Sequence, residues 1–281
     1  MSEKIYFNTS NKFSVKRSLV NVSTRLHHRL APHHARNTAR KLLLTPLRTK
    51  PKNSAPQGLV KGQVTSKEGV LSTYSLGSGP VWVLTHGWSG TASQYFPLME
   101  HIASRGYTAL AYDHPGHGES EGVYGHIPAF VAGLEAVLDS VDDVAGLVGH
   151  SMGTASAIEC HHAKLVDKPL LLIAPVLDYL DNLFGSVARS GYSMRLFNDV
   201  VQEVEAQYRY PIQSIDPYYK LSQRQSPTII VHDEGDKFTK FSVSQRAANE
   251  MSNVVLVATQ GQGHGRVMMC KQVMASFDNL I

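Results

Sequence analysis

Several features that would indicate particular classes of protein are missing from this sequence. Its 281 residues contain no apolar run close to the roughly 18–20 residues of a transmembrane helix, so we expect no membrane-spanning segment. The two cysteines, Cys160 and Cys270, are too few for a disulfide framework and are typical of reduced thiols in a reducing compartment. We therefore expect a cytoplasmic protein, and a hydrophobic content of 42% over this length is enough for a packed α/β domain.

Acidic residues are nearly absent from the beginning of the chain. Residues 1–60 hold twelve lysines and arginines but a single acid, Glu3, whereas the remainder holds 15 basic and 22 acidic side chains. The net charge of +4 thus belongs to a basic N-terminal arm, placed at residues 1–58, and the rest of the chain is mildly acidic. We therefore expect no nucleic acid to bind the body of the protein, while weak contact between the arm and an anionic membrane is one hypothesis.

The arm itself has two interpretations. Its arginines and serines and its lack of acids are typical of a mitochondrial transit peptide, which would place the protein in mitochondria instead of the cytoplasm. Alternatively, the arm is an integral part of the protein, partly helical or disordered. An amphipathic helix is then expected within residues 35–47, ending before Pro46, with the leucines at 42–44 facing the body or a membrane surface. Residues 50–57, which contain two prolines, are the predicted linker.

From residue 59 onward, apolar and amphipathic segments alternate in the way typical of α/β proteins. Strands are predicted at 59–65, 70–76, 81–85, 107–112, 144–148, 170–174, 228–232 and 254–258, and helices at 91–104, 127–138, 152–164, 241–251 and 267–280. This alternation predicts a mostly parallel, doubly wound sheet with helices on both faces, opened by an antiparallel pair of strands. The domain is placed at residues 59–281, with a small helical cap inserted at about 176–225.

The most informative segment is Gly149-His150-Ser151-Met152-Gly153, which fits the pattern G-x-S-x-G between a predicted strand and a predicted helix. The two glycines permit the sharp turn that lifts a serine hydroxyl above the sheet, at the positive end of the following helix. A serine in an ordinary tight turn would need the same glycines. A nucleophile needs three more things: a base, a group that orients the base, and donors for an oxyanion.

A histidine and an aspartate that follow later strands are candidates for the base and its orienting group. His264 lies on the glycine-rich loop after the last strand, and of the fourteen histidines it is the one in the right element. Asp236 follows the preceding strand and is the predicted orienting carboxylate, with Asp233 and, more remotely, Asp178 as alternatives. These positions lie just after strands, where the chemistry of parallel sheets is found.

Two backbone N–H groups are predicted to bind the oxyanion. Met152 directly follows the candidate nucleophile, and Trp88 lies in the loop after the strand at 81–85. His86 lies in the same loop, and we expect it to fix the loop instead of taking part in catalysis. No cofactor is expected, and the histidine pairs of the arm lack a nearby cysteine or carboxylate to complete a metal site.

Five segments in this order resemble the α/β-hydrolase fold family, from about residue 59 to the end of the chain. They are HGW at 86–88, DHPGHGES at 113–120, GHSMG at 149–153, HDEGD at 232–236 and GQGH at 261–264. The family carries its triad in the chain order serine, acid, histidine, so the resemblance implies the triad Ser151, Asp236 and His264. It also implies that the loop with Ser120 is structural, so this serine is not expected to be a rival nucleophile.

Other comparisons with the family refine this expectation. Serine at position 151 excludes the aspartate nucleophile of the dehalogenase and epoxide-hydrolase branches. The loop after Trp88 lacks the HGGG pattern of the hormone-sensitive-lipase-like branch. The segment LLLTPLRTKP at 42–51 is similar to the arm that precedes the domain in some bacterial members, which favours an integral arm over a transit peptide.

The cap region is rich in aromatic and other large apolar residues. They are Tyr179, Phe184, Tyr192, Met194, Phe197, Tyr208, Tyr210, Tyr218 and Tyr219. Such residues either line an apolar acyl pocket or pack the cap helices together. The region has no cluster of charges that would point to a phosphate or carboxylate group on the substrate.

The sequence thus predicts a serine hydrolase that cleaves a carboxylic ester through an acyl-enzyme. The same residues would serve a thioesterase, an amidase or a C–C bond hydrolase, so the expected partner is a small acyl ester or thioester. A hydrolase-fold protein that binds without catalysis is a further alternative. Nothing in the sequence indicates the oligomeric state.

Overall fold

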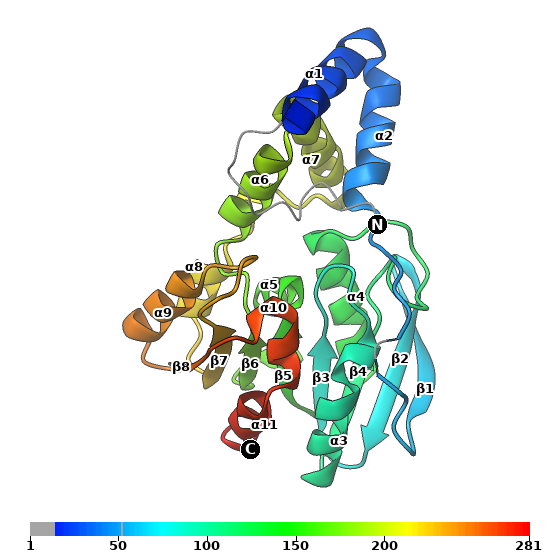
Figure 1. Cartoon of the computed structure of the whole chain (residues 1–281). Helices are drawn as coiled ribbons and strands as arrows, with labels where there is room; N and C mark the ends of the chain where they lie inside the picture. Colours follow the sequence, from blue (N-terminus) through cyan, green and yellow to red (C-terminus); the bar gives the residue numbers. More distant parts are fainter. Residues whose placement is uncertain (1–14, 52) are drawn as a thin grey trace. The chain divides into compact units, whose positions relative to one another are not determined.

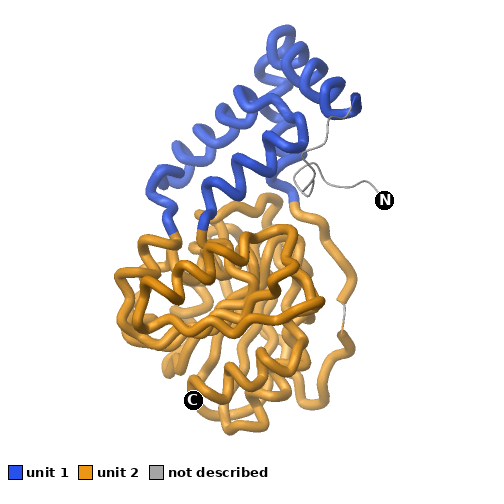
Figure 2. The backbone as a smooth tube through the Cα atoms, turned by 60° about the vertical axis from the view of Figure 1, so that its left-hand side comes forward, with its two compact units in different colours: residues 1–45, 178–216 blue, residues 46–177, 217–281 orange. Residues whose placement is uncertain are grey.

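The computed structural model describes residues 15–51 and 53–281. Contacts divide the chain into two compact units, coloured separately in Figure 2. The smaller unit combines the described part of residues 1–45 with residues 178–216, and the larger unit comprises residues 46–177 and 217–281. This division differs from the expected one, because helices of the arm share one unit with the middle of the expected cap.

The larger unit is built on one eight-stranded sheet, in the order β1-β2-β4-β3-β5-β6-β7-β8 (Figure 1). Its strands are β1 (Val60–Ser66), β2 (Gly69–Gly77), β3 (Val81–Thr85), β4 (Thr108–Tyr112), β5 (Val144–His150), β6 (Leu170–Ile173), β7 (Thr228–Asp233) and β8 (Val254–Thr259). β2 pairs antiparallel with β1 and β4, and the other pairs are parallel. The predicted mostly parallel sheet is therefore confirmed, and all eight predicted strands are present.

Helices cover both faces of this sheet. They are α3 (Phe96–Ser104), α4 (Ile127–Asp139), α5 (Met152–Glu159), α8 (Pro217–Ser222), α9 (Phe241–Glu250), α10 (Gly263–Arg266) and α11 (Lys271–Asp278). Trp82 and Leu84 of β3 pack in one cluster with Met99 of α3 and Phe277 of α11. Val83, between them, is also fully buried and points to the opposite face, as the pleat of a strand requires. The strand is therefore apolar throughout because both its faces are covered.

Some predicted helices are shorter than expected. The segment predicted as one helix at 91–104 begins as a 3₁₀ turn, Ala92–Tyr95, and becomes α-helical where Pro97 occupies the first turn of α3. The helix expected at 152–164 ends at Glu159, because Cys160 adopts an extended conformation. Within residues 15–51 and 53–281, no helix combines the length and apolar character that crossing a bilayer requires.

Four α-helices make up most of the described part of the smaller unit. They are α1 (Val15–Leu30), α2 (Pro32–Leu44), α6 (Tyr179–Ser190) and α7 (Met194–Tyr208). The helix predicted within residues 35–47 is α2, which begins earlier, with Pro32 in its first turn, and ends before Pro46. Leu43 is buried in a cluster with Leu196 and Phe197 of α7, so it packs within its own unit.

Candidate active site

Ser151 lies at the junction of β5 and α5, at the carboxyl end of the sheet. Its φ of 53° and ψ of −125° are strained for a residue with a side chain, as a nucleophile elbow requires. Two glycines make the turn possible, because a Cβ at Gly149 would lie 2.9 Å from Thr154 Cα and one at Gly153 would lie 2.2 Å from Thr85 O. The local sequence thus places the serine at the first turn of α5.

His264 comes from α10, the short helix that follows β8. Its Nε2 lies 2.9 Å from Ser151 Oγ, and its Nδ1 lies 2.7 Å from Asp236 Oδ2. The serine hydroxyl can donate to Nε2 while Nδ1–H donates to the carboxylate. The imidazole is 16% exposed, whereas the carboxylate is fully buried. A hydroxyl, an imidazole and a carboxylate joined in this way are suited to remove a proton from the serine.

The Asp236 carboxylate accepts further hydrogen bonds from its own turn. Its Oδ1 accepts the backbone N–H of Phe238 at 2.7 Å, and its Oδ2 accepts the hydroxyl of Thr239 at 2.9 Å. The Nε2 of His232 lies 3.3 Å from Oδ2. Burial alone would raise the pKa of Asp236, but the hydrogen bonds from His232 and His264 outweigh burial and hold the pKa well below its usual range. The carboxylate therefore stays ionised and can orient an imidazole.

The two alternative carboxylates are placed differently. Asp233, at the end of β7, accepts the backbone N–H of Gln262 at 2.8 Å. Asp233 therefore holds the loop that carries His264, whereas the imidazole itself is bonded to Asp236. Asp178 belongs to the smaller unit. Of the three candidates, Asp236 is the one that accepts the Nδ1–H of the imidazole.

The loop after β3 lies against Ser151. A Cβ at Gly87 would come within 2.8 Å of Ser151 Cβ, so only glycine permits this approach. Trp88 follows Gly87 and Met152 opens α5, which places the two predicted N–H donors on the segments next to the serine. His86 is buried, which lowers its pKa, and its Nδ1–H donates to Gly87 O at 2.8 Å. This histidine therefore holds the loop.

Hydrogen bonds tie the loop after β4 to its own backbone and to the backbone of two neighbouring segments. Asp113 accepts the N–H groups of Ala92 at 2.8 Å and of Glu119 at 2.9 Å. The buried Ser120 hydroxyl donates to Asp113 O at 2.6 Å and accepts the N–H of Ser72 at 2.9 Å. Because its hydroxyl is committed in this way, Ser120 has the structural role that the resemblance implies.

A comparison with protein families identifies the family of this chain. Residues 82–275 match the sequence profile of a family described as the alpha/beta hydrolase family. The chain belongs to this family. A search of curated protein sequences gave no match to this hydrolase.

Solved structures similar to this hydrolase share its fold. The esterase Pf2001 of Pyrococcus furiosus is 20% identical with a TM-score of 0.63, covering 84% of this chain and 98% of its own. Est1E from Butyrivibrio proteoclasticus, in a structure with ferulic acid bound, is 17% identical with a TM-score of 0.63, covering 78% of this chain and 98% of its own. The epoxide hydrolase VrEH1 from Vigna radiata is 15% identical with a TM-score of 0.57, covering 81% of this chain and 98% of its own.

His150 is a residue near the hydrolase site that the sequence did not single out. Its Nε2–H donates to the backbone oxygen of His264 at 2.9 Å, and the two rings lie 5.0 Å apart. Burial first, and then the charge of His264, lower the pKa of His150 to about 3, so its ring is neutral. Its Nδ1 has no hydrogen-bond partner among the described residues. The contact fastens the segment that carries the imidazole beside the serine.

The aromatic residues expected in the cap are divided between the two units. Tyr192 and Phe197 are buried in the core of the smaller unit, and Phe184 packs on Phe197 with ring centroids 5.2 Å apart. Tyr218 and Tyr219 belong to α8 of the larger unit. The aromatic residues in the core of the smaller unit therefore pack its helices together.

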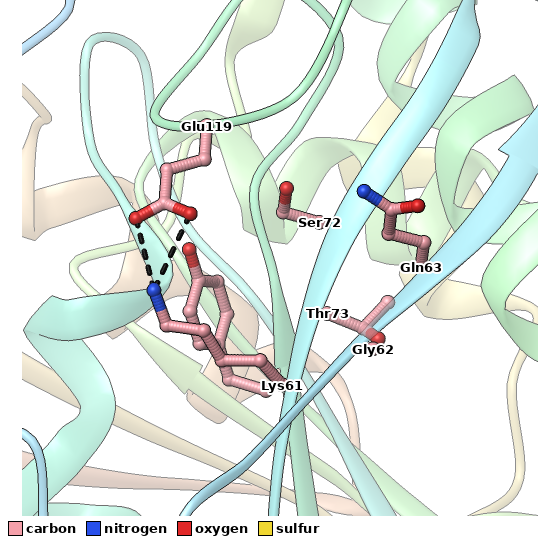
Figure 3. Close-up of a pocket in the computed structure, with 7 residues that line it drawn as sticks. Lys61, Gly62, Gln63, Ser72, Thr73 and Glu119 are labelled. Atoms are coloured by element: carbon pink, nitrogen blue, oxygen red, sulfur yellow. Dashed lines mark hydrogen bonds and ion pairs between the residues drawn. The ribbon is translucent and has the colours of Figure 1, made fainter.

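A hollow of about 350 Å³ lies on the first two strands of the hydrolase (Figure 3). It is lined by residues 61–63 of β1, residues 72–74 of β2, and Glu119. The Lys61 ammonium lies 3.2 Å from Glu119 Oε1 and 5.5 Å from the centroid of the Tyr74 ring, so the two charges neutralise each other. Because none of the residues around Ser151 lines this hollow, we assign it no catalytic role.

Proposed function

We propose that this protein is a serine hydrolase that cleaves a carboxylic ester by way of an acyl-enzyme. Ser151 is the nucleophile, His264 the general base and acid, and Asp236 the carboxylate that orients the imidazole. The observation that carries the proposal is the continuous hydrogen-bond chain from Asp236 Oδ2 through the imidazole to Ser151 Oγ. Such a chain keeps Nε2 unprotonated and aimed at the hydroxyl.

The first half of the reaction forms the acyl-enzyme. Ser151 Oγ attacks the carbonyl carbon of the ester while its proton passes to His264 Nε2. The backbone N–H groups of Met152 and Trp88 stabilise the negative oxygen of the tetrahedral intermediate. When the intermediate collapses, the bond to the alcohol breaks, and the alcohol oxygen takes the proton from Nε2.

The second half returns the enzyme to its starting state. A water molecule gives a proton to His264 Nε2 and attacks the acyl carbon. The bond between the acyl carbon and Ser151 Oγ then breaks, the serine oxygen recovers its proton from the imidazole, and the carboxylic acid leaves. Throughout both halves, the ionised Asp236 accepts Nδ1–H and stabilises the positive charge that develops on the imidazole.

The choice of an ester rests on the family and on analogy with similar structures. One similar structure, Pf2001, is named as an esterase, and another, Est1E, holds ferulic acid, an aromatic carboxylic acid. A thioester, an amide and a C–C bond are the other bonds that the same three residues could cleave. We place the reaction in the cytoplasm, because Cys160 and Cys270 are both free and buried, as in a reducing compartment.

The direct test compares the full-length protein with its Ser151→Ala variant on p-nitrophenyl esters and on thioesters of varied acyl length. The wild type should hydrolyse oxygen esters fastest, and the variant should lose about 10⁴-fold or more in kcat because the nucleophile is gone. A variant that kept near-normal activity would contradict the mechanism. Faster turnover of thioesters than of esters would replace the proposed substrate class but retain the triad.

A further inference from the structure

Helix α1 of the smaller unit carries its apolar side chains on its exposed face. Val15, Leu19, Val22, Leu26 and Leu30 are between 53% and 73% exposed. Their spacing of three or four residues places them in one row along the helix. Isolated exposed leucines are common on protein surfaces, but five large apolar residues in a continuous row mark an interaction surface. We call these five residues the apolar row of α1.

The opposite face of α1 is the one that packs on the rest of its unit, and it does so largely through polar contacts. Asn21 Nδ2 donates to Gly191 O at 3.1 Å, and Thr24 Oγ1 accepts the backbone N–H of Ser193 at 3.2 Å. His28 Nε2 lies 2.8 Å from Asp199 Oδ2. The helix is therefore fixed by its polar side, and the apolar row is not turned inward to complete the core.

The lysine and arginine side chains beside the apolar row are not balanced by any acidic residue of α1. The sequence of α1, VKRSLVNVSTRLHHRL, contains four lysines and arginines and no acid. Lys16, Arg25 and Arg29 are exposed, and the 100° turn per residue places them beside the row, not opposite it. An apolar row flanked by cations is the pattern of helices that lie in the plane of a membrane interface.

We propose that the apolar row of α1 docks on an anionic membrane surface, with the leucines and valines at the acyl boundary and the flanking cations at anionic headgroups. Charge complementarity selects this occupant. A second copy of the chain would bring its own cationic α1 against this one, with no acid on either helix to offset the repulsion. An anionic headgroup layer instead attracts each exposed lysine and arginine.

The test is flotation of the full-length protein with vesicles of phosphatidylcholine mixed with phosphatidylglycerol, and with vesicles of phosphatidylcholine alone. The wild type should float with the mixed vesicles and remain behind with the neutral ones. Leu19→Ser/Leu26→Ser should lower the partition coefficient on mixed vesicles about tenfold or more, because two anchoring side chains are lost. Arg25→Gln/Arg29→Gln should weaken the binding and make it less sensitive to salt.

A matched control removes two other exposed leucines that lie outside the row. Leu42 and Leu47 are 45% and 46% exposed, and Leu42→Ser/Leu47→Ser should bind vesicles as the wild type does. Circular dichroism and hydrolysis of a soluble ester verify that each variant is folded. Equal binding of the Leu19→Ser/Leu26→Ser variant and the wild type would overturn the proposal. So would equal binding to neutral vesicles, or a wild-type dimer that the same double variant converts to a monomer.

Discussion

The two compact units relate sequence to structure in different ways. In the larger unit, apolar runs became strands covered on both faces, and motif residues that follow those strands meet at Ser151. In the smaller unit, α1 is fixed by polar contacts to residues about 170 positions away, such as the bond from Asn21 to Gly191 O, while its apolar row is exposed. The pattern of apolar residues therefore identifies the core of the larger unit, but in α1 the same kind of pattern identifies exposed residues.

The largest effect expected concerns the carboxylate behind the imidazole in the larger unit. Asp236→Asn should lower kcat on a p-nitrophenyl ester by about 10⁴-fold, because an amide no longer holds the imidazole with Nε2 free to accept a proton. Glu234→Gln, at an exposed neighbouring position, is the matched control and should retain nearly full activity. Similar rates for Asp236→Asn and the control would show that the imidazole is oriented by another group.

Substitution of two leucines in the smaller unit should distinguish its buried core from the exposed apolar row of α1. Leu196 of α7 is fully buried, so Leu196→Ala should reduce the free energy of unfolding by about 2–5 kcal/mol. Leu19 of α1 is exposed, and Leu19→Ala should change this free energy by no more than about 0.5 kcal/mol. Urea denaturation followed by circular dichroism measures both. A loss at Leu19 as large as that at Leu196 would mean that the apolar row is part of a core.

A smaller effect should appear in the pH dependence of stability. The pKa of His150 falls from 6.5 to about 3 on folding, mainly through burial, so between these pH values the unfolded chain binds a proton that the folded protein does not. This residue therefore makes the protein less stable as pH falls from 6.5 towards 3. His150→Gln should reduce that slope by up to about 1.4 kcal/mol per pH unit.

The matched control for this measurement is the same substitution at the exposed His161. Denaturation curves for the wild type and both variants, collected across this pH range, give the three slopes. An unchanged slope in His150→Gln would show that His150 does not stay neutral in the folded protein. A lower kcat in His150→Phe than in His150→Gln, whose amide can still donate to His264 O, would separate its positioning contact from its titration.

The strands and the Ser151 turn could be predicted because their signals are local. A continuous apolar run bounded by glycine or proline identifies a buried strand, and a serine between glycines after such a strand identifies the elbow. His264 and Asp236 could be predicted because each follows a later strand, although Asp233 offered the same signal three residues earlier. The partners of the two aspartates in the structure distinguish them. Asp233 accepts the N–H of Gln262, in the loop before His264, whereas Asp236 accepts the Nδ1–H of the imidazole.

Other features have no comparable signal in the sequence. His150 contacts a backbone oxygen, which every residue possesses, so nothing about position 264 identifies it as the partner. Helix α1 does carry apolar residues at helical spacing within Val15–Leu30, but those residues are exposed and its inward face is largely polar, so the pattern does not indicate how the helix packs. Nor could the sequence indicate that α2 packs on α7, which follows about 150 residues later.

The central claim is that Ser151 is a nucleophile activated by His264, and the rate and site of labelling by a fluorophosphonate test it most directly. Mass spectrometry should find the label on Ser151 of the full-length protein, and His264→Ala should slow labelling by about 10³-fold or more, since the serine loses its base. A label on another residue, or equal labelling rates with and without the imidazole, would contradict the account.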